Sequence, residues 1–223
     1  MLLLQIKVPL KILLLIFLLA GMSSFSQKND SSEPYGYDVH IGAKVGANFN
    51  KVIGEEWLET YNTNMLAGLF LGVNGRRTGI QIEGLWSMNT AVSDTSFGGL
   101  YSQYFQSGKD SVATGKFTFH TFSIPVLLNL KLNQILWLQA GPQYTTRISE
   151  LDGDDLLESG KTVFSKGELA AVAGVWLNIG KVGPLPKFNI GGRFITSINN
   201  VNDLGDQAKW RNQRLQFHIG IGF

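Results

Sequence analysis

The chain has 223 residues, enough for a single all-β domain of the larger kind. Glycine is abundant at 26 residues, 11 % of the residues are aromatic, and only 16 % are charged, well below the typical quarter. The absence of cysteine excludes a disulfide framework, a thiol nucleophile and a lipidated N-terminal cysteine.

Residues 1–26 are predicted to be a cleaved signal peptide. Lys7 and Lys11 supply a positive start, and the apolar stretch after them is too short to span a bilayer. Ser24-Phe25-Ser26 fits a small-x-small cleavage site; the alternative is an uncleaved signal anchor. Cleavage removes two of the 19 Lys and Arg residues and none of the 17 Asp and Glu residues. The mature chain then has no net charge, and no basic block indicates a nucleic-acid partner.

Residues 27–37 are polar and are expected to form a short lead into one folded domain, residues 38–223. In that domain eight segments alternate apolar and polar residues with the period of a β-strand. They cover residues 39–49, 65–74, 80–89, 122–132, 136–145, 168–179, 188–194 and 215–223. A tilted strand needs about 9–11 residues to span a membrane, and no stretch is long and apolar enough for a spanning helix.

The last segment is the most informative. Its residues 215, 217, 219, 221 and 223 are all apolar and alternate with polar residues or glycine. This pattern, ending on the aromatic Phe223, is the usual last strand of a bacterial outer-membrane barrel. The terminal aromatic residue resembles the assembly signal that the barrel-assembly machinery reads.

The connections between segments alternate in length. Short connections are expected at residues 74–78, 133–134 and 181–186, and long ones at 50–64, 90–116, 148–166 and 197–212. Short periplasmic turns and long external loops are typical of membrane barrels, and place both termini in the periplasm. We therefore predict an eight-stranded antiparallel up-and-down transmembrane β-barrel. The alternative, a soluble lipocalin-like barrel or sandwich, would have an exterior with unusually little charge.

Three stretches carry a family resemblance. They are the cleavage region Ser24–Gln27, the glycine-rich first strand Ile41–Phe49, and a central hairpin formed by Phe122–Lys131 and Leu138–Tyr144. These resemble the small outer-membrane β-barrels of Bacteroidetes, the outer membrane protein β-barrel domain or PorT-like group of the porin family. The resemblance implies an outer-membrane location, and the group includes a component linked to type IX secretion.

The polar faces of the strands are expected to enclose a filled lumen. Its predicted residues are Lys44, Gln81, Glu83, Asn129, Lys131, Gln139, Arg193, Gln216 and His218. Eight strands enclose an interior just wide enough for side chains to fill. Because an unpaired buried charge is costly, Glu83 should pair with Lys44, Lys131 or Arg193. The alternative is a narrow conducting pore.

Histidines offer two further hypotheses, each with a simpler alternative. His40 and His218 face inward on neighbouring strands and could share a metal, although two separate lumen side chains are favoured. His120 and Ser123 suggest a lipid hydrolase, but strand parity places them on opposite faces unless a bulge intervenes. We therefore expect no catalytic residue, metal or cofactor.

Two external loops carry the remaining candidates. The acidic stretch 152–158 could bind Ca²⁺ but lacks the full EF-hand pattern, so a solvated loop is favoured. Tyr101, Tyr104 and Phe105 could anchor a partner or the lipid interface, or pack over the barrel mouth.

The expected function is that of an integral outer-membrane barrel with a structural or loop-mediated binding role. Its expected partners are outer-membrane lipid and lipopolysaccharide, the barrel-assembly machinery, and an envelope or secretion protein. A narrow solute pore or a secretion-associated barrel is the alternative, and a lipid-modifying enzyme is a remote one.

Overall fold

The structure is a computed structural model that describes residues 37–97, 114–152, 163–181, 187–203 and 208–223. Its strands are β1 (Asp38–Ile53), β2 (Asn62–Asn74), β3 (Thr78–Val92), β4 (Lys116–Lys131), β5 (Leu136–Asp152), β6 (Gly167–Lys181), β7 (Lys187–Ser197) and β8 (Arg211–Gly222). No helix in the described ranges is long and apolar enough to cross a bilayer. The predicted signal peptide and nearly all of the lead lie outside these ranges, and both stay predictions.

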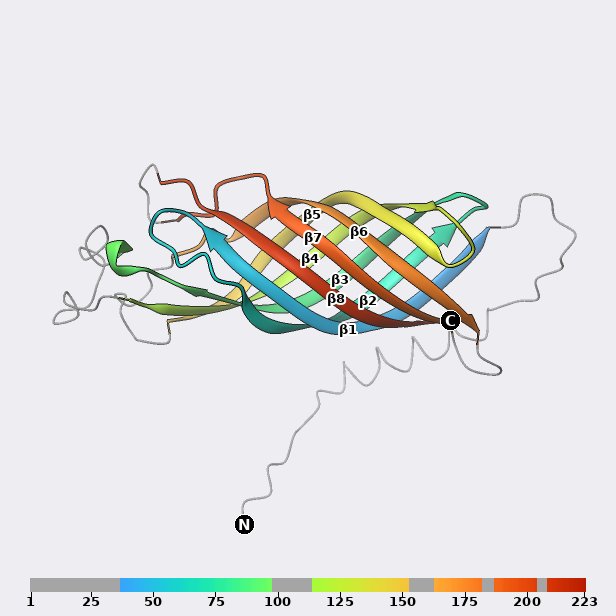
Figure 1. The fold of residues 1–223 in the computed structure, drawn as a ribbon, viewed down its shortest axis with the longest axis horizontal. Helices are drawn as coiled ribbons and strands as arrows, with labels where there is room; N and C mark the ends of the chain where they lie inside the picture. Colours follow the sequence, from blue (N-terminus) through green and yellow to red (C-terminus); the bar gives the residue numbers. More distant parts are fainter. Residues whose placement is uncertain (1–36, 98–113, 153–162, 182–186, 204–207) are drawn as a thin grey trace, which may run out of the picture.

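Each strand pairs antiparallel with its neighbours along the chain, and β8 returns to pair with β1 (Figure 1). The predicted eight-stranded up-and-down barrel is therefore confirmed. The closing seam runs from Gly42 opposite Gly222 to Ile53 opposite Arg211. Closure satisfies the backbone groups that an open sheet edge would leave unpaired, which a membrane barrel requires.

The two ends of the barrel differ. The end here named the turn end holds the β2–β3 and β4–β5 turns, the start of β1 and Phe223; it lies at the right in Figure 1. The opposite end, the loop end, holds the connections β1–β2, β3–β4, β5–β6 and β7–β8. The predicted alternation of short and long connections is thus present.

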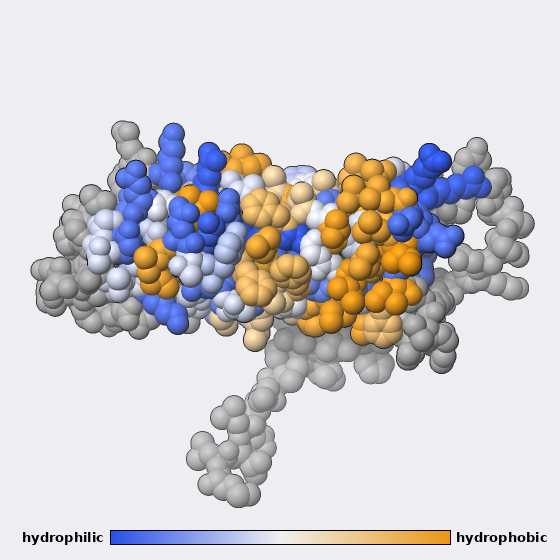
Figure 2. All heavy atoms as spheres, viewed as in Figure 1, coloured by the Kyte–Doolittle hydropathy of each residue, from blue (hydrophilic) through white to orange (hydrophobic). Residues whose placement is uncertain are grey.

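An apolar belt surrounds the turn-end half of the barrel. Outward side chains there are large, apolar and exposed, for example Val45 at 61 %, Ile80 at 56 % and Phe217 at 56 %. Figure 2 shows this belt as the orange surface, next to a more polar surface that continues to the loop end. Exposed apolar residues in a continuous band are what a lipid-facing surface requires, and strand parity predicted these outward faces correctly.

The strands are longer at the loop end than predicted. β3 continues to Val92 and β5 to Asp152, both inside segments that we expected to be loops. In this region Phe117 and Phe119 are buried inside while Lys116 is exposed outside. The alternation thus continues, but its polarity is reversed, because outside the apolar belt the barrel wall faces water. Because the prediction required apolar residues on the outer face, it placed the ends of these strands too early.

Candidate functional site

The centre of the lumen holds one carboxylate between two cations. Lys44 Nζ donates to Glu83 Oε1 at 2.6 Å, and Arg193 donates to both carboxylate oxygens, at 2.9 and 3.1 Å. Gln81 Nε2 donates to Glu83 Oε1 at 2.5 Å. Glu83, Lys44 and Arg193 are all buried, with 2–4 % of each residue exposed. A bidentate Arg–carboxylate pair is strong and geometrically specific, so these four residues form a defined, desolvated unit, the Glu83 cluster.

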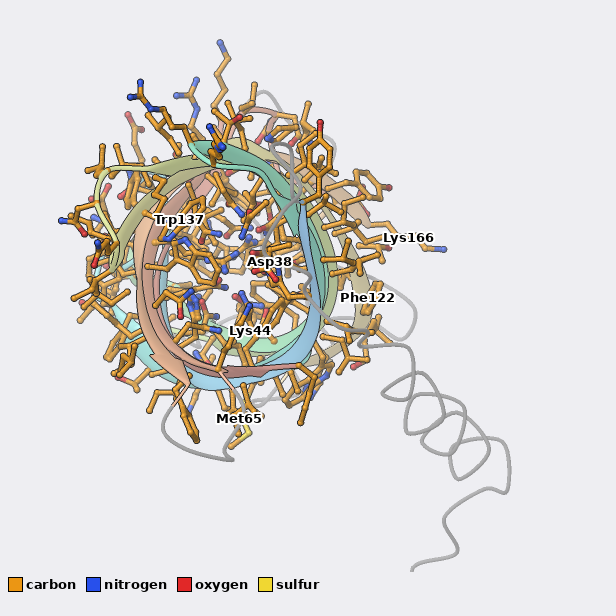
Figure 3. All side chains as sticks on the ribbon, turned by 90° about the vertical axis from the view of Figure 1, so that its right-hand side faces the viewer. Asp38, Lys44, Met65, Phe122, Trp137 and Lys166 are labelled. Atoms are coloured by element: carbon orange, nitrogen blue, oxygen red, sulfur yellow. The ribbon has the colours of Figure 1, made fainter. Side chains whose placement is uncertain are left out.

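The Glu83 cluster connects opposite walls of the barrel. Glu83 lies on β3 and Arg193 on β7, four strands apart in either direction around the ring. Lys44, on β1, comes from midway between them. Figure 3 shows Lys44 inside the ring of strands, whereas Met65 and Phe122 project outward. At this level, side chains from opposite walls are therefore in direct contact across the lumen.

The cluster has one more cation than carboxylate, and an aromatic ring accompanies that charge. Lys44 Nζ lies 5.2 Å from the ring centroid of Phe70, which projects inward from β2. A cation over a ring face is attracted by the ring quadrupole, more strongly when desolvated. Phe70 thus helps to accommodate the positive charge without a second carboxylate.

Amide side chains fill the lumen on both sides of the Glu83 cluster. Toward the turn end, Gln139 Nε2 donates to Asn129 Oδ1 at 2.9 Å, and Asn129 Nδ2 donates to Asn74 Oδ1 at 3.3 Å. Toward the loop end, Asn48 Nδ2 donates to Asn89 Oδ1 at 3.0 Å. Buried polar groups are costly unless hydrogen-bonded, so these bonds stabilise a polar interior.

A second buried ion pair lies nearer the loop end. Arg214 donates to Glu168 Oε2, and Asn212 Nδ2 donates to the same oxygen at 2.8 Å. Arg214 is 2 % exposed and Glu168 is 5 % exposed. The prediction omitted this pair because the alternation that defines the last strand begins at Leu215. Arg214 has the same parity as Gln216, and that is the signal by which it could have been found.

An apolar cluster closes the lumen at the loop end, and we name it the aromatic cap. Its members are Val52, Trp57, Ala91, Phe97, Phe117, Phe119, Val163, Phe164, Val201 and Trp210. The rings of Trp57 and Trp210 pack edge to face with centroids 5.1 Å apart. Trp210 Nε1 donates to Glu56 Oε2 at 2.7 Å, so this buried carboxylate has a hydrogen-bond donor. Each of the four loop-end connections contributes at least one member, so the cap joins their bases together.

Hydrogen bonds hold two of these connections in place. Asp94 N donates to the Glu56 carbonyl at 2.9 Å, and Ser96 N donates to Asp94 Oδ1 at 2.8 Å. The Ser96 hydroxyl also donates to this carboxylate and lowers the pKa of Asp94 below its usual range. Asp94 thereby caps the short helical turn that carries Phe97 into the aromatic cap.

One predicted lumen residue, Lys131, lies away from the Glu83 carboxylate. Lys131 is only half-buried at the turn end, where its Nζ lies 5.5 Å from the ring centroid of Trp137. Ile82, next to Glu83 on β3, pairs with Val126 of β4. Val126 is five residues from Lys131, which is roughly 17 Å along β4. Of the three cations expected as alternative partners of Glu83, Lys44 and Arg193 pair with it and Lys131 does not, because parity fixes the side of the wall whereas register fixes the height. His218, in contrast, is buried in the lumen against Gly191 and lies close enough to the Glu83 cluster to interact with the charges of Lys44, Arg193 and Glu83.

The two inward histidines do not share a site. His218 lies opposite Gly46, six residues from His40 along β1, which is roughly 20 Å. His40 instead stacks on Trp176 with ring centroids 6.1 Å apart. Within the described ranges, no three His, Cys, Asp or Glu side chains form a group that could hold a metal.

His120 and Ser123 lie on opposite sides of the wall. The His120 ring stacks on Trp86 with centroids 5.5 Å apart, whereas Ser123 is buried and hydrogen-bonded to Thr145 at 3.0 Å. The β4–β5 register does shift next to His120, but the extra residue is Ile148 of β5. Parity along β4 is therefore unchanged, and these two residues do not form a base–nucleophile pair.

Cavities in the lumen are small. One of ≈ 10 Å³ lies at the turn end beside His40 and Trp176, and another of ≈ 10 Å³ lies below the aromatic cap beside Glu168 and Asn212. Each has room for about one water molecule. The other loop candidates, Tyr101, Tyr104, Phe105 and the acidic stretch 152–158, fall outside the described side chains.

The family model for the outer membrane protein beta-barrel domain matches residues 25–203. The chain belongs to this family. It is thus an integral β-barrel protein of the bacterial outer membrane, in agreement with the closed barrel and its apolar belt. A comparison with curated protein sequences finds no relative.

Solved structures of small outer-membrane barrels have a similar fold. Ail of Yersinia pestis is 13 % identical with a TM-score of 0.44, and 83 % of this chain covers 99 % of that protein. Neisserial surface protein A is 14 % identical with a TM-score of 0.45, with coverage of 84 % and 99 %. OprG of Pseudomonas aeruginosa is 11 % identical with a TM-score of 0.47, with coverage of 84 % and 96 %. At such low identity, nothing about function follows from these similarities.

Proposed function

We propose that this protein is a closed outer-membrane barrel that does not conduct and that presents its loop end to a partner. The observation that carries the proposal is the contact between opposite walls in the Glu83 cluster. Above it lie the Glu168–Arg214 pair and then the aromatic cap, so three filled layers follow one another along the lumen. A barrel filled in this way serves as a scaffold, and its binding surface is on the outside.

In the proposed orientation the turn end and both termini face the periplasm, and the loop end faces outward. The apolar belt supports this placement, because it surrounds only the turn-end half of the barrel (Figure 2). The outer surface beyond the belt carries polar and charged side chains such as Lys116 and Arg211. The part of the barrel beyond the belt would thus hold the loops above the membrane surface, and the aromatic cap would fix the ends of the loops next to the strands.

Planar-bilayer recording tests the closed lumen. The mature protein should give no steady conductance, whereas a steady open current would support the narrow pore instead. The double substitution Glu83→Ala with Arg193→Ala is the matched variant, since it removes both ends of the contact across the lumen. Folding of each protein is checked by heat-modifiable gel mobility before recording.

Partner capture tests the loop end. The mature protein is used to capture proteins from native outer membranes, alongside a variant whose residues 98–113 are replaced by a Gly–Ser linker of equal length. A partner retained by the unmodified protein and lost with the variant is the expected result, because residues 98–113 include Tyr101, Tyr104 and Phe105. Identical captured sets would contradict binding through this loop.

We also infer that the chain follows the export route of the Bacteroidetes PorT-like group, which it resembles in its first strand and central hairpin. In this proposal residues 1–26 are removed on export, the barrel-assembly machinery reads Phe223, and lipopolysaccharide surrounds the outward part of the belt. Mass spectrometry of protein from the outer membrane should find Gln27 at, or within a few residues of, the N-terminus. An intact N-terminal segment would contradict cleavage.

A further inference from the structure

The outer surface at the turn end has a groove of ≈ 270 Å³, which we name the rim groove. Its walls include Tyr37, Val73, Gly75, Thr78, Ile80 and Leu128. It lies where the apolar belt ends, at the first turn between strands. No other part of the proposed function uses this surface.

One wall of the rim groove is a row of apolar side chains across three strands. Val73 of β2 lies opposite Ile80 of β3, and Ile80 lies opposite Leu128 of β4. These residues are 40, 56 and 57 % exposed on the outer face. Tyr37, 72 % exposed, forms the facing wall beside Gly75, where a Cβ atom, if one were added, would lie 3.9 Å from the tyrosine ring. An apolar groove in a lipid-facing surface suits an acyl chain.

Two cations lie on the turn that adjoins this groove. Arg76 and Arg77 form the turn between Gly75 and Thr78; both are exposed, and neither has a carboxylate partner among the described residues. The turn is fixed by two hydrogen bonds, from Gly75 N to the Thr78 carbonyl at 2.8 Å and from Lys131 N to the Arg77 carbonyl at 2.7 Å. The backbone that carries the two cations is thus fixed between Gly75 and Thr78, which line the groove.

Neighbouring groups at the same end do not offer this combination. Lys187 is already paired with Asp38 at 2.8 Å, and Lys131 lies over the Trp137 ring. The β4–β5 turn contains Asn133 and Gln134 and carries no charge. Unpaired positive charge next to an apolar groove is therefore a particular property of the β2–β3 turn among the described turns.

We propose that the rim groove binds one anionic glycerophospholipid. Its acyl chain lies along Val73, Ile80 and Leu128, and its phosphate is bound by Arg76 and Arg77. Arginine suits this role because its planar guanidinium group binds phosphate oxygens in pairs, and clustered basic residues at a membrane surface select anionic lipids. The site goes beyond the proposed function and depends on it only for the leaflet, which is the periplasmic one.

Native mass spectrometry of the mature protein tests the site. The protein is released from detergent with phosphatidylglycerol or phosphatidylcholine of the same chain length. One phosphatidylglycerol should be retained with a preference of roughly thirtyfold, since each of the two basic residues near the surface contributes about 1 kcal/mol toward anionic lipid. The double variant R76Q/R77Q should lose the preference, and Y37A should retain less of both lipids.

The matched control is K166Q/K209Q, which removes two exposed cations at the loop end. It should retain phosphatidylglycerol as the unmodified protein does. Equal retention of the two lipids by the unmodified protein, or the same loss in both double variants, would overturn the proposal. Full competition by soluble glycerol phosphate would also overturn it, because the site would then be specific for phosphate alone. None of these outcomes depends on conductance or on a loop partner.

Discussion

At the scale of single residues, Glu83 is the side chain on which the lumen depends. It accepts hydrogen bonds from Lys44, Arg193 and Gln81 and is 2 % exposed. Glu83→Gln keeps the size of the side chain but leaves two buried cations without a counter-charge. Removal of one member of a buried pair costs on the order of 3–5 kcal/mol. The urea midpoint for unfolding in lipid vesicles should therefore fall markedly.

Glu59→Gln is the control for this substitution. Glu59 pairs with Lys51 at 3.4 Å, but about half of its side chain is exposed, at 51 %. Surface pairs of this kind contribute about 0–1 kcal/mol. The two variants should therefore differ clearly in urea midpoint, and equal midpoints would contradict the structural role of the Glu83 cluster.

Two glycines on the closing seam make a second residue-scale prediction. A Cβ atom at Gly46 would lie 2.0 Å from the carbonyl oxygen of Phe217, whereas at Gly222 the nearest atom, on Phe70, would lie at 3.7 Å. Gly46→Ala therefore forces the β1 and β8 backbones apart, at a cost of about 1–3 kcal/mol. Gly222→Ala should fold normally. The folded fraction on heat-modifiable gels measures both variants, and equal folding would refute the steric argument.

At the scale of strands, the sequence was informative about faces and less so about ends. Every strand has the predicted outward face, because a period of two leaves only two choices and the lipid selects the apolar one. Strand ends were wrong at the loop end, where Phe117 and Phe119 point inward and Lys116 points to water. The position of the bilayer boundary, which the sequence pattern does not contain, would have been needed to correct these strand ends.

Pairing across the lumen was predictable only in part. Parity places Glu83, Lys44 and Lys131 inside, but it does not say which of them share a height. Height depends on the stagger between strands that are not neighbours in the sequence, and that stagger is set by barrel closure. The choice between Arg193, which pairs with Glu83, and Lys131, which does not, therefore required the structure.

The end of β8 gives an element-scale prediction. Phe223 N donates to the Ile41 carbonyl at 2.8 Å, and Ile41 N donates to the Phe223 carbonyl at 3.3 Å. Deletion of Phe223 removes both the seam bonds and the terminal aromatic ring, whereas Phe223→Ser keeps the backbone and removes only the ring. If assembly depends on the aromatic signal, both variants should give less folded barrel in the outer membrane. A normal yield for Phe223→Ser would assign the effect to the seam bonds instead.

At the scale of the whole molecule, two interiors of different character lie along one barrel. Within the apolar belt the interior is mixed: the buried charges of the Glu83 cluster and the amide side chains lie among apolar residues such as Leu127 and Trp176. Beyond the belt the interior is mainly apolar and contains the aromatic cap. Each interior follows from what surrounds the barrel wall. Where lipid lies outside, the apolar residues of a strand face outward and the polar ones face the lumen; where water lies outside, the arrangement is reversed. The barrel thus combines a membrane protein and a soluble-type core in one continuous sheet.

These two interiors should be separable by mutation. Trp210→Ala removes a fully buried ring from the aromatic cap and leaves the Glu56 carboxylate without its indole donor. Truncation of a buried tryptophan costs about 3–5 kcal/mol, but that loss falls on the loop end and not on the Glu83 cluster. Limited proteolysis should cut the loop-end connections faster, while heat-modifiable mobility still reports a folded barrel. Ile198→Ala, which shortens a side chain 57 % exposed at the same end, should leave cleavage unchanged. Equal protease sensitivity in the two variants would show that the cap does not hold the loops, and the loop end would then lose its support as a rigid binding surface.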